Sequence, residues 1–117
     1  MADDTIFGKI LRGEIPCDEV YSDDRCLAFR DIAPQAPVHV LVIPKGAYVS
    51  VVDFSAKASD VEIAGFWRGV EQVAQQLDIV TPGFRMAANH GADSNQEVPH
   101  FHVHMFAGRN LKGMLPG

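Results

Sequence analysis

Three histidines alternate with apolar residues near the C-terminus, at His100, His102 and His104. If this segment is a β-strand, its successive side chains point to opposite faces, so the three imidazoles share one face. The intervening apolar side chains then share the other face, which is expected to lie on a core. Neighbouring residues on one face are roughly 6.5–7 Å apart, and imidazole can be neutral or charged near pH 7. The imidazoles can therefore converge on one ligand the size of a phosphate or a metal ion.

Three interpretations of the histidine face follow from its chemistry. Alternate histidines can supply two or three zinc ligands, with Asp93 and Glu97 nearby in sequence, but no His-Glu-x-x-His motif or cysteine pair accompanies them. Alternatively, a neutral imidazole nitrogen can attack phosphorus; this requires a fixed acceptor for the other ring N–H and donors for the phosphate oxygens. The third interpretation is a solvated face without a ligand. The residues alone leave all three open.

Length and charge restrict the classes of protein that this chain can form. A chain of 117 residues predicts a single domain over residues 1–117. A net charge of −5 argues against a general nucleic-acid-binding surface but not against a small anionic ligand. No apolar run approaches the ~18–20 residues of a membrane span, and the acidic start differs from a signal peptide. Cys17 and Cys26 lack a C-x-x-C spacing and are expected to be reduced thiols, so a cytoplasmic location without membrane partners is predicted.

The spacing of apolar residues predicts one short and one long helix. Asp3-Asp4-Thr5 offers an N-cap for a helix over residues 6–11, which Gly13 ends. Ser59 and Glu62 have the spacing of a capping box, and a long apolar stripe follows them at helical periodicity. The residues of the stripe are Ile63, Phe66, Trp67, Val70, Val73, Ala74 and Leu77.

Runs of β-branched and aromatic residues predict the strands of a sheet. These strands are expected over residues 19–22, 26–30, 38–43 and 84–89, and along the histidine segment itself. A further short extended piece is expected over residues 48–54. His39 shares a strand face with Leu41 and Ile43, which makes it a histidine in an apolar strand. Because helices and strands do not alternate regularly, the element order predicts an α+β fold with an antiparallel sheet.

Two glycines interrupt the long helix one turn apart, at Gly65 and Gly69. Each destabilises a helix by roughly 0.8–1 kcal/mol relative to alanine. Either a neighbouring group, such as a second subunit, approaches this side of the helix closely, or the domain simply tolerates both residues.

The histidine segment resembles the motif of the histidine-triad (HIT) nucleotide-binding family. Residues 4–10, 26–32 and 34–45 are similar to the bacterial members of its Hint branch, so the resemblance covers nearly the whole chain. It implies an α+β fold with a five-stranded antiparallel sheet and two helices. It also implies a homodimer in which the two sheets join. The implied activity is hydrolysis of purine nucleoside 5′-phosphoramidates and acyl-adenylates through a covalent nucleotidyl-histidine, with no metal or other cofactor.

The resemblance also implies roles for individual residues. His102 matches the nucleophile, His100 and His104 flank it, and His39 completes the catalytic cluster. The matching nucleotide-binding positions, which include the base pocket and the groups near ribose and phosphate, are Ile6, Phe7, Ile10, Phe29, Asp31, Ile32, Leu41, Asn89, Gln96 and Glu97. Without the resemblance, Ile10 and Leu41 are explained equally well as core residues.

Two departures from the family pattern affect these expectations. Animal members commonly have a serine where this chain has Glu97, so we expect its carboxylate to point away from the phosphate or to contact the leaving amine. The tail from Leu111 to Gly117 lacks the tryptophan of animal members, which leaves the leaving-group preference open. His90 is expected to be an ordinary loop residue. A dinucleoside polyphosphate hydrolase and a non-catalytic nucleotide-binding regulatory module remain alternative functions.

Overall fold

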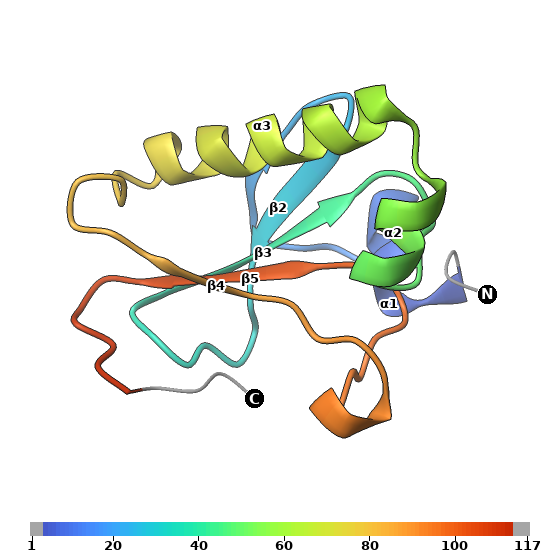
Figure 1. Cartoon of the computed structure of the whole chain (residues 1–117). Helices are drawn as coiled ribbons and strands as arrows, with labels where there is room; N and C mark the ends of the chain where they lie inside the picture. Colours follow the sequence, from blue (N-terminus) through green and yellow to red (C-terminus); the bar gives the residue numbers. More distant parts are fainter. Residues whose placement is uncertain (1–3, 114–117) are drawn as a thin grey trace.

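A computed structural model describes residues 4–113. Its centre is a five-stranded antiparallel sheet with the strand order β1-β2-β3-β5-β4, shown edge-on in Figure 1. The strands are β1 (Glu19–Ser22), β2 (Cys26–Arg30), β3 (Val38–Pro44), β4 (Arg85–Ala87) and β5 (Val103–Ala107). The predicted α+β class and antiparallel sheet are confirmed. Part of the tail discussed above, residues 114–117, lies outside the described residues.

The helices are α1 (Ile6–Leu11), α2 (Val51–Lys57) and α3 (Asp60–Gln76), and a 3-10 turn, η2, spans Ala92–Ser94. Both predicted helices form with the predicted caps. The Thr5 side chain accepts from the amide of Gly8, and Ser59 and Glu62 form the reciprocal capping box of α3. No helix within residues 4–113 has the length and hydropathy needed to cross a membrane.

Helix α2 corrects the sequence-based prediction of an extended piece over residues 48–54. Ser50 begins the helix by accepting from the amide of Val52, and the Asp53 carboxylate lies in the first turn, where it accepts from the amide of Val49. These two caps outweigh the β propensity of the local valines. The described residues therefore contain three α-helices, where the resemblance implied two.

The two faces of the sheet are covered unequally. Figure 1 shows α3 running along one face, and Val40, Val42 and Met105 from that face form the larger core cluster with Phe54 and Phe66. On the other face a second cluster brings a side chain of the short helix α1 against the sheet. Its buried members are Phe7, Leu27, Phe29, Leu41 and Ile43.

The histidine segment forms less strand than predicted. Hydrogen-bonded strand begins only at Val103, so His100 and His102 precede β5 and only His104 lies within it. The alternation of faces nevertheless persists. Phe101 belongs to the larger cluster beneath α3, whereas His100 and His102 both lie against Phe7 of α1.

The two glycines of α3 face the sheet of their own chain, which removes the need for a second subunit on this side. A Cβ at Gly69 would collide with Sγ of Cys26, and a Cβ at Gly65 would collide with the side chain of Arg25. Cys26 is fully buried on β2, so its sulfur has no free space to move into. Arg25 is exposed, and its aliphatic part is flexible.

We therefore expect Gly69→Ala to lower the free energy of unfolding by about 1–3 kcal/mol, because α3 must move away from β2. Gly65→Ala is the matched control and should be close to neutral, since Arg25 can rotate away and alanine favours the helix. Urea denaturation of both variants measures the difference. Equal stability of the two variants would contradict this account of α3 packing.

Candidate active site

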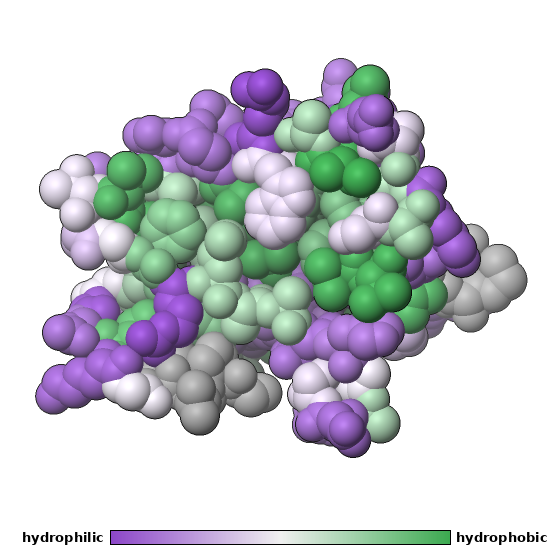
Figure 2. Space-filling model, in the orientation of Figure 1, coloured by the Kyte–Doolittle hydropathy of each residue, from purple (hydrophilic) through white to green (hydrophobic). Residues whose placement is uncertain are grey.

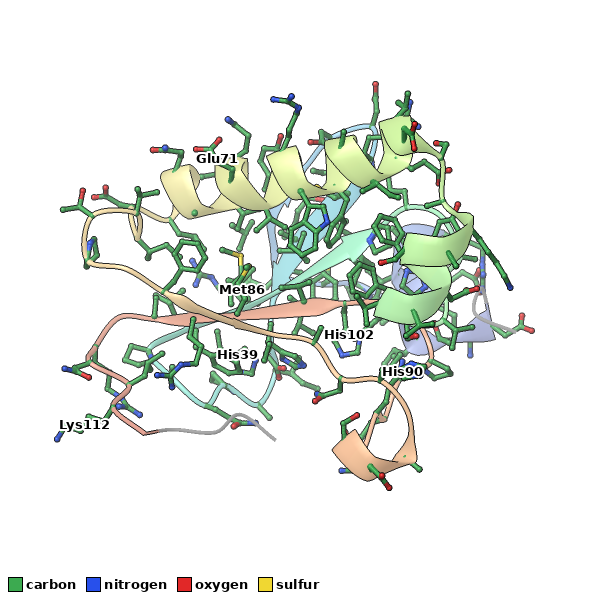
Figure 3. The ribbon with its side chains drawn as sticks, in the orientation of Figure 1. His39, Glu71, Met86, His90, His102 and Lys112 are labelled. Carbon is green, nitrogen blue, oxygen red and sulfur yellow. The ribbon has the colours of Figure 1, made fainter. Side chains whose placement is uncertain are left out.

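Four histidines gather on the face of the sheet opposite α3. His39 comes from β3, His104 from β5, and His100 and His102 from the segment before β5. The ring centroid of His102 is 5.0 Å from that of Phe7 and 5.0 Å from that of His104. Figure 3 shows His39 and His102 on this side of the sheet, away from α3.

A main-chain carbonyl selects the tautomer of His102. The ring Nδ1 lies 2.7 Å from the carbonyl oxygen of His100, and a carbonyl can only accept, so the proton is on Nδ1. Nε2 of the neutral ring then carries the unshared electron pair. The side chain is 8 % exposed, which leaves this nitrogen a limited opening to the surface.

His100 is anchored in the same way but is more deeply placed. Its ring is completely buried, and its Nε2–H donates to the carbonyl of Pro44 over 3.1 Å. This bond ties the segment before β5 to the end of β3. The geometry of His100 therefore supports His102, because the His100 carbonyl is the group that orients the His102 ring.

His39 and His104 form a second, directly bonded pair. The backbone N–H of Gln35 donates to Nδ1 of His39 over 3.1 Å, so the proton of neutral His39 is on Nε2. That nitrogen lies 3.0 Å from Nδ1 of His104 and 3.4 Å from the Asp31 carboxylate. When His39 donates to His104, the proton of His104 is on its Nε2.

Burial favours the neutral form of His39, His102 and His104. It lowers the pKa of His102, although the bond to the His100 carbonyl and the charge of Asp31 oppose the shift. Burial, with smaller repulsions from His102 and His39, lowers the pKa of His104 to about 4. Burial also lowers the pKa of His39, against the opposing charge of Asp31. A neutral His102 retains the electron pair that a nucleophile needs.

The predicted base-pocket residues divide into buried and exposed groups. Phe7, Phe29 and Leu41 are at most 7 % exposed and pack in one cluster, with partly buried Ile10 against it. In contrast, Ile6 is 47 % exposed and Ile32 is 99 % exposed. Two large apolar side chains thus face solvent on segments adjoining this cluster and Asp31.

The predicted phosphate-side residues are less uniformly placed. Asn89 is half-buried, just beyond β4, where Ala87 pairs with His104. The side-chain amide of Gln96 donates to the carbonyls of Val49 and Val98 and accepts from the amide of Gly91. Its side chain therefore holds the loop together. Glu97 is exposed, and its carboxylate is 3.5 Å from Nδ2 of Asn95.

Comparison with known proteins identifies the family. The HIT domain model matches residues 12–111. This chain belongs to the HIT family. It is 56% identical over 110 residues to an uncharacterized HIT-like protein of Azospirillum brasilense, covering 94% of this chain and 90% of that protein. It is 44% identical over 115 residues to a purine nucleoside phosphoramidase of Escherichia coli K12, covering 98% and 96% respectively.

Solved HIT structures share the fold. A HIT family hydrolase from Clostridium thermocellum superposes with a TM-score of 0.87 at 31% identity, covering 99% of this chain and 100% of that one. A histidine triad protein from Clostridium difficile superposes with a TM-score of 0.80 at 41% identity, covering 97% and 95%. The resemblance of the sequence to this family is confirmed.

Asp31, His39 and His104 form the one group within residues 4–113 whose ligand atoms could hold a metal ion, all within 4.8 Å of one another. This differs from the zinc interpretation of the sequence, which relied on alternate histidines of one strand. His100 and His102 direct ring nitrogens to main-chain carbonyls instead. Asp31 also accepts from the amide of Ala33.

Three contacts of this HIT site carry no signal in local sequence. The amide of Gln35 and the carbonyl of Pro44 are main-chain groups, which any residue supplies. The third contact joins Ser50 to His90 over 2.7 Å, although His90 is an ordinary loop residue by sequence. A cavity of about 760 Å³ lies elsewhere, between the end of α3, the start of β4 and residues 108–112, and no histidine lines it.

The lowered pKa of His104 predicts acid sensitivity of the fold. Between the ordinary value of 6.5 and the folded value of about 4, the unfolded chain binds a proton that the folded ring does not. The free energy of unfolding should therefore decrease as pH falls through this window, by up to about 1.4 kcal/mol per pH unit for this group. In His104→Gln the decrease should be less steep by urea denaturation, and an unchanged slope would contradict the assignment.

Proposed function

We propose that this protein hydrolyses purine nucleoside 5′-phosphoramidates, and the related acyl-adenylates, with His102 as nucleophile. The observation that carries the proposal is the arrangement of one ring: Nδ1 of His102 donates to the His100 carbonyl, and burial keeps the ring neutral. Such a nitrogen can attack phosphorus without first losing a proton. The relationship to the E. coli purine nucleoside phosphoramidase supports the choice of substrate.

The reaction has two balanced halves in this proposal. Nε2 of His102 first forms a bond to phosphorus, the P–N bond breaks, and the nitrogen leaves as an amine after taking a proton from solvent. Water then attacks the nucleotidyl-histidine, the N–P bond breaks, and a nucleoside monophosphate is released. The attacking water returns the proton, so the enzyme regains its starting state.

The remaining polar groups have matching roles in the proposal. His104 donates from Nε2 to a non-bridging phosphate oxygen, in the tautomer that its bond with His39 favours. Asp31 accepts from the ribose hydroxyls, for which its partly exposed carboxylate is suited. Asn89 contributes near the phosphate and ribose, at the end of β4 nearest the histidines.

The apolar residues and the loop complete the proposed nucleotide site. The base rests against the cluster of Phe7, Phe29 and Leu41, with Ile6, Ile10 and Ile32 around it. Gln96 acts by shaping its loop, and the backbone N–H of Glu97 is the group offered to the phosphate. The exposed carboxylate of Glu97 is directed to the leaving amine.

Turnover of an adenosine 5′-phosphoramidate in the presence of a chelator tests this function. Wild-type protein should release adenosine monophosphate and amine, and His102→Ala should lose about 10³-fold or more of the activity. Mass spectrometry of quenched reactions should find a nucleotide on His102. Undiminished turnover by His102→Ala would exclude the proposed nucleophile.

The same experiment separates the alternative functions. Tight binding of the nucleoside monophosphate without turnover would indicate a regulatory module. Preferential cleavage of dinucleoside polyphosphates would indicate the neighbouring hydrolase branch. Stoichiometric zinc by elemental analysis, with activity lost in chelator, would favour a metal at Asp31, His39 and His104.

A homodimer with a continuous sheet is also part of the proposal. β4 is an edge strand, and its Met86 is 46% exposed, while Trp67 of α3 is 40% exposed. Figure 2 shows hydrophobic surface between the polar outer side of α3 and β4. An exposed edge strand beside an apolar surface is suited to pairing with the same strand of a second copy.

Met86→Lys should convert this dimer to a monomer, because it places a charge beside the pairing edge. Light scattering after size exclusion should give the 12.8 kDa mass of one chain for the variant and twice that mass for wild type. Val61→Lys, at an exposed apolar position near the start of α3, is the control and should remain dimeric. A monomeric wild type at micromolar concentration would contradict the proposal.

A further inference from the structure

A buried hydroxyl connects α2 to the loop of residues 90–101, which lies between β4 and β5. Ser50 is 1% exposed, and its Oγ accepts from the amide of Val52 as the N-cap of α2. The same oxygen lies 2.7 Å from Nδ1 of His90. A buried hydroxyl needs an acceptor for its own hydrogen, so Ser50 donates to Nδ1, and the proton of neutral His90 is on Nε2.

Two further bonds join the same short segment to the same loop. The side-chain amide of Gln96 donates to the carbonyl of Val49 over 2.8 Å. The backbone N–H of Phe101 donates to the carbonyl of Tyr48 over 2.7 Å. Three consecutive residues, 48–50, therefore hold the beginning, the later part and the far end of the loop.

The held loop leads directly to the nucleophile. Asn89 immediately precedes His90, and the other end of the loop contains His100, whose carbonyl orients the ring of His102. Figure 3 shows His90 below the sheet at the end near α2, on the same side as His102. A displacement of the loop would therefore move both the predicted phosphate-side groups and the carbonyl behind the nucleophile.

We propose that His90 is a positioning residue, whose Nδ1 acts through Ser50 to hold the 90–101 loop in the geometry that the reaction of His102 requires. This inference rests on the proposed function and adds to it a residue that contacts neither substrate nor the reacting nitrogen. None of the residues that make the three bonds belongs to the base cluster, and among the apolar residues of the loop only Val98 packs against it. The effect should therefore fall on kcat, since small misplacements at a reacting centre are costly, and KM should change little.

Two substitutions of His90 distinguish the hydrogen bond with Ser50 from the mere presence of a polar side chain at this position. In His90→Asn, Oδ1 can occupy the place of Nδ1 and accept from Ser50, whereas the longer side chain of His90→Gln puts its oxygen near the place of Nε2. With an adenosine phosphoramidate, kcat should fall about tenfold in His90→Gln and stay within about threefold of wild type in His90→Asn. Ser50→Ala should match His90→Gln, and the double variant should be no worse than either single one.

Because Ser50→Ala also removes the N-cap of α2, a second variant controls for the loss of a helix cap. Ser59→Ala removes the N-cap of α3 and should lower the Tm as Ser50→Ala does, while its kcat stays unchanged. An unchanged kcat in His90→Gln, or an equal loss in His90→Asn, would overturn the positioning role.

Hydrogen exchange distinguishes failure of this inference from failure of the proposed function. The amides of Asn95 and Gln96 are bonded within the loop and should exchange faster in His90→Gln but not in His90→Asn. If wild type hydrolyses no phosphoramidate, this exchange pattern still supports the role of His90 and Ser50 in holding the loop, although the proposed function has failed. Equal exchange of these amides in wild type and His90→Gln would show that His90 does not hold the loop.

Discussion

Main-chain groups decide which nitrogen of each buried histidine carries a proton. The carbonyls of Pro44 and His100 accept from His100 and His102, and the amide of Gln35 donates to His39. A buried imidazole without such a partner would be destabilising, because its polar atoms lose their hydration. The bonds that these rings make also choose their tautomers, so the same contacts that stabilise the fold prepare Nε2 of His102 for chemistry.

The unequal covering of the sheet explains why the histidines gather where they do. α3 spans 17 residues and lies over one face, which allows a continuous apolar core beneath it. α1 spans six residues, too few to be stable alone, and depends on packing of Phe7 against Phe29. A helix this short covers only part of the second face: His100 and His102 lie against its Phe7, whereas His104 stays partly exposed.

Local sequence predicted the elements whose signals are contained within a few residues. The capping box of Ser59 and Glu62 defined α3, and the alternation of histidines with apolar residues separated the two faces even where strand pairing is absent. α2 was missed because its valines favour strands, while its caps at Ser50 and Asp53 are single residues. Gly69 was ambiguous because the sulfur of Cys26 that it accommodates lies on another element.

The polar loop shows most clearly where sequence reasoning ends. Gln96 and His90 are both polar residues beside the histidine motif; the family resemblance placed Gln96 at the nucleotide, and His90 was expected to be an ordinary loop residue. The structure uses the Gln96 side chain to bond Val49 and Gly91, and it places His90 against a serine 40 residues away in sequence. Neither contact has a periodicity or a spacing that could be recognised beforehand. The Gln96 side chain, whose amide donors are already bonded within the fold, has little left to offer a ligand, so its influence on chemistry passes through the backbone that it holds.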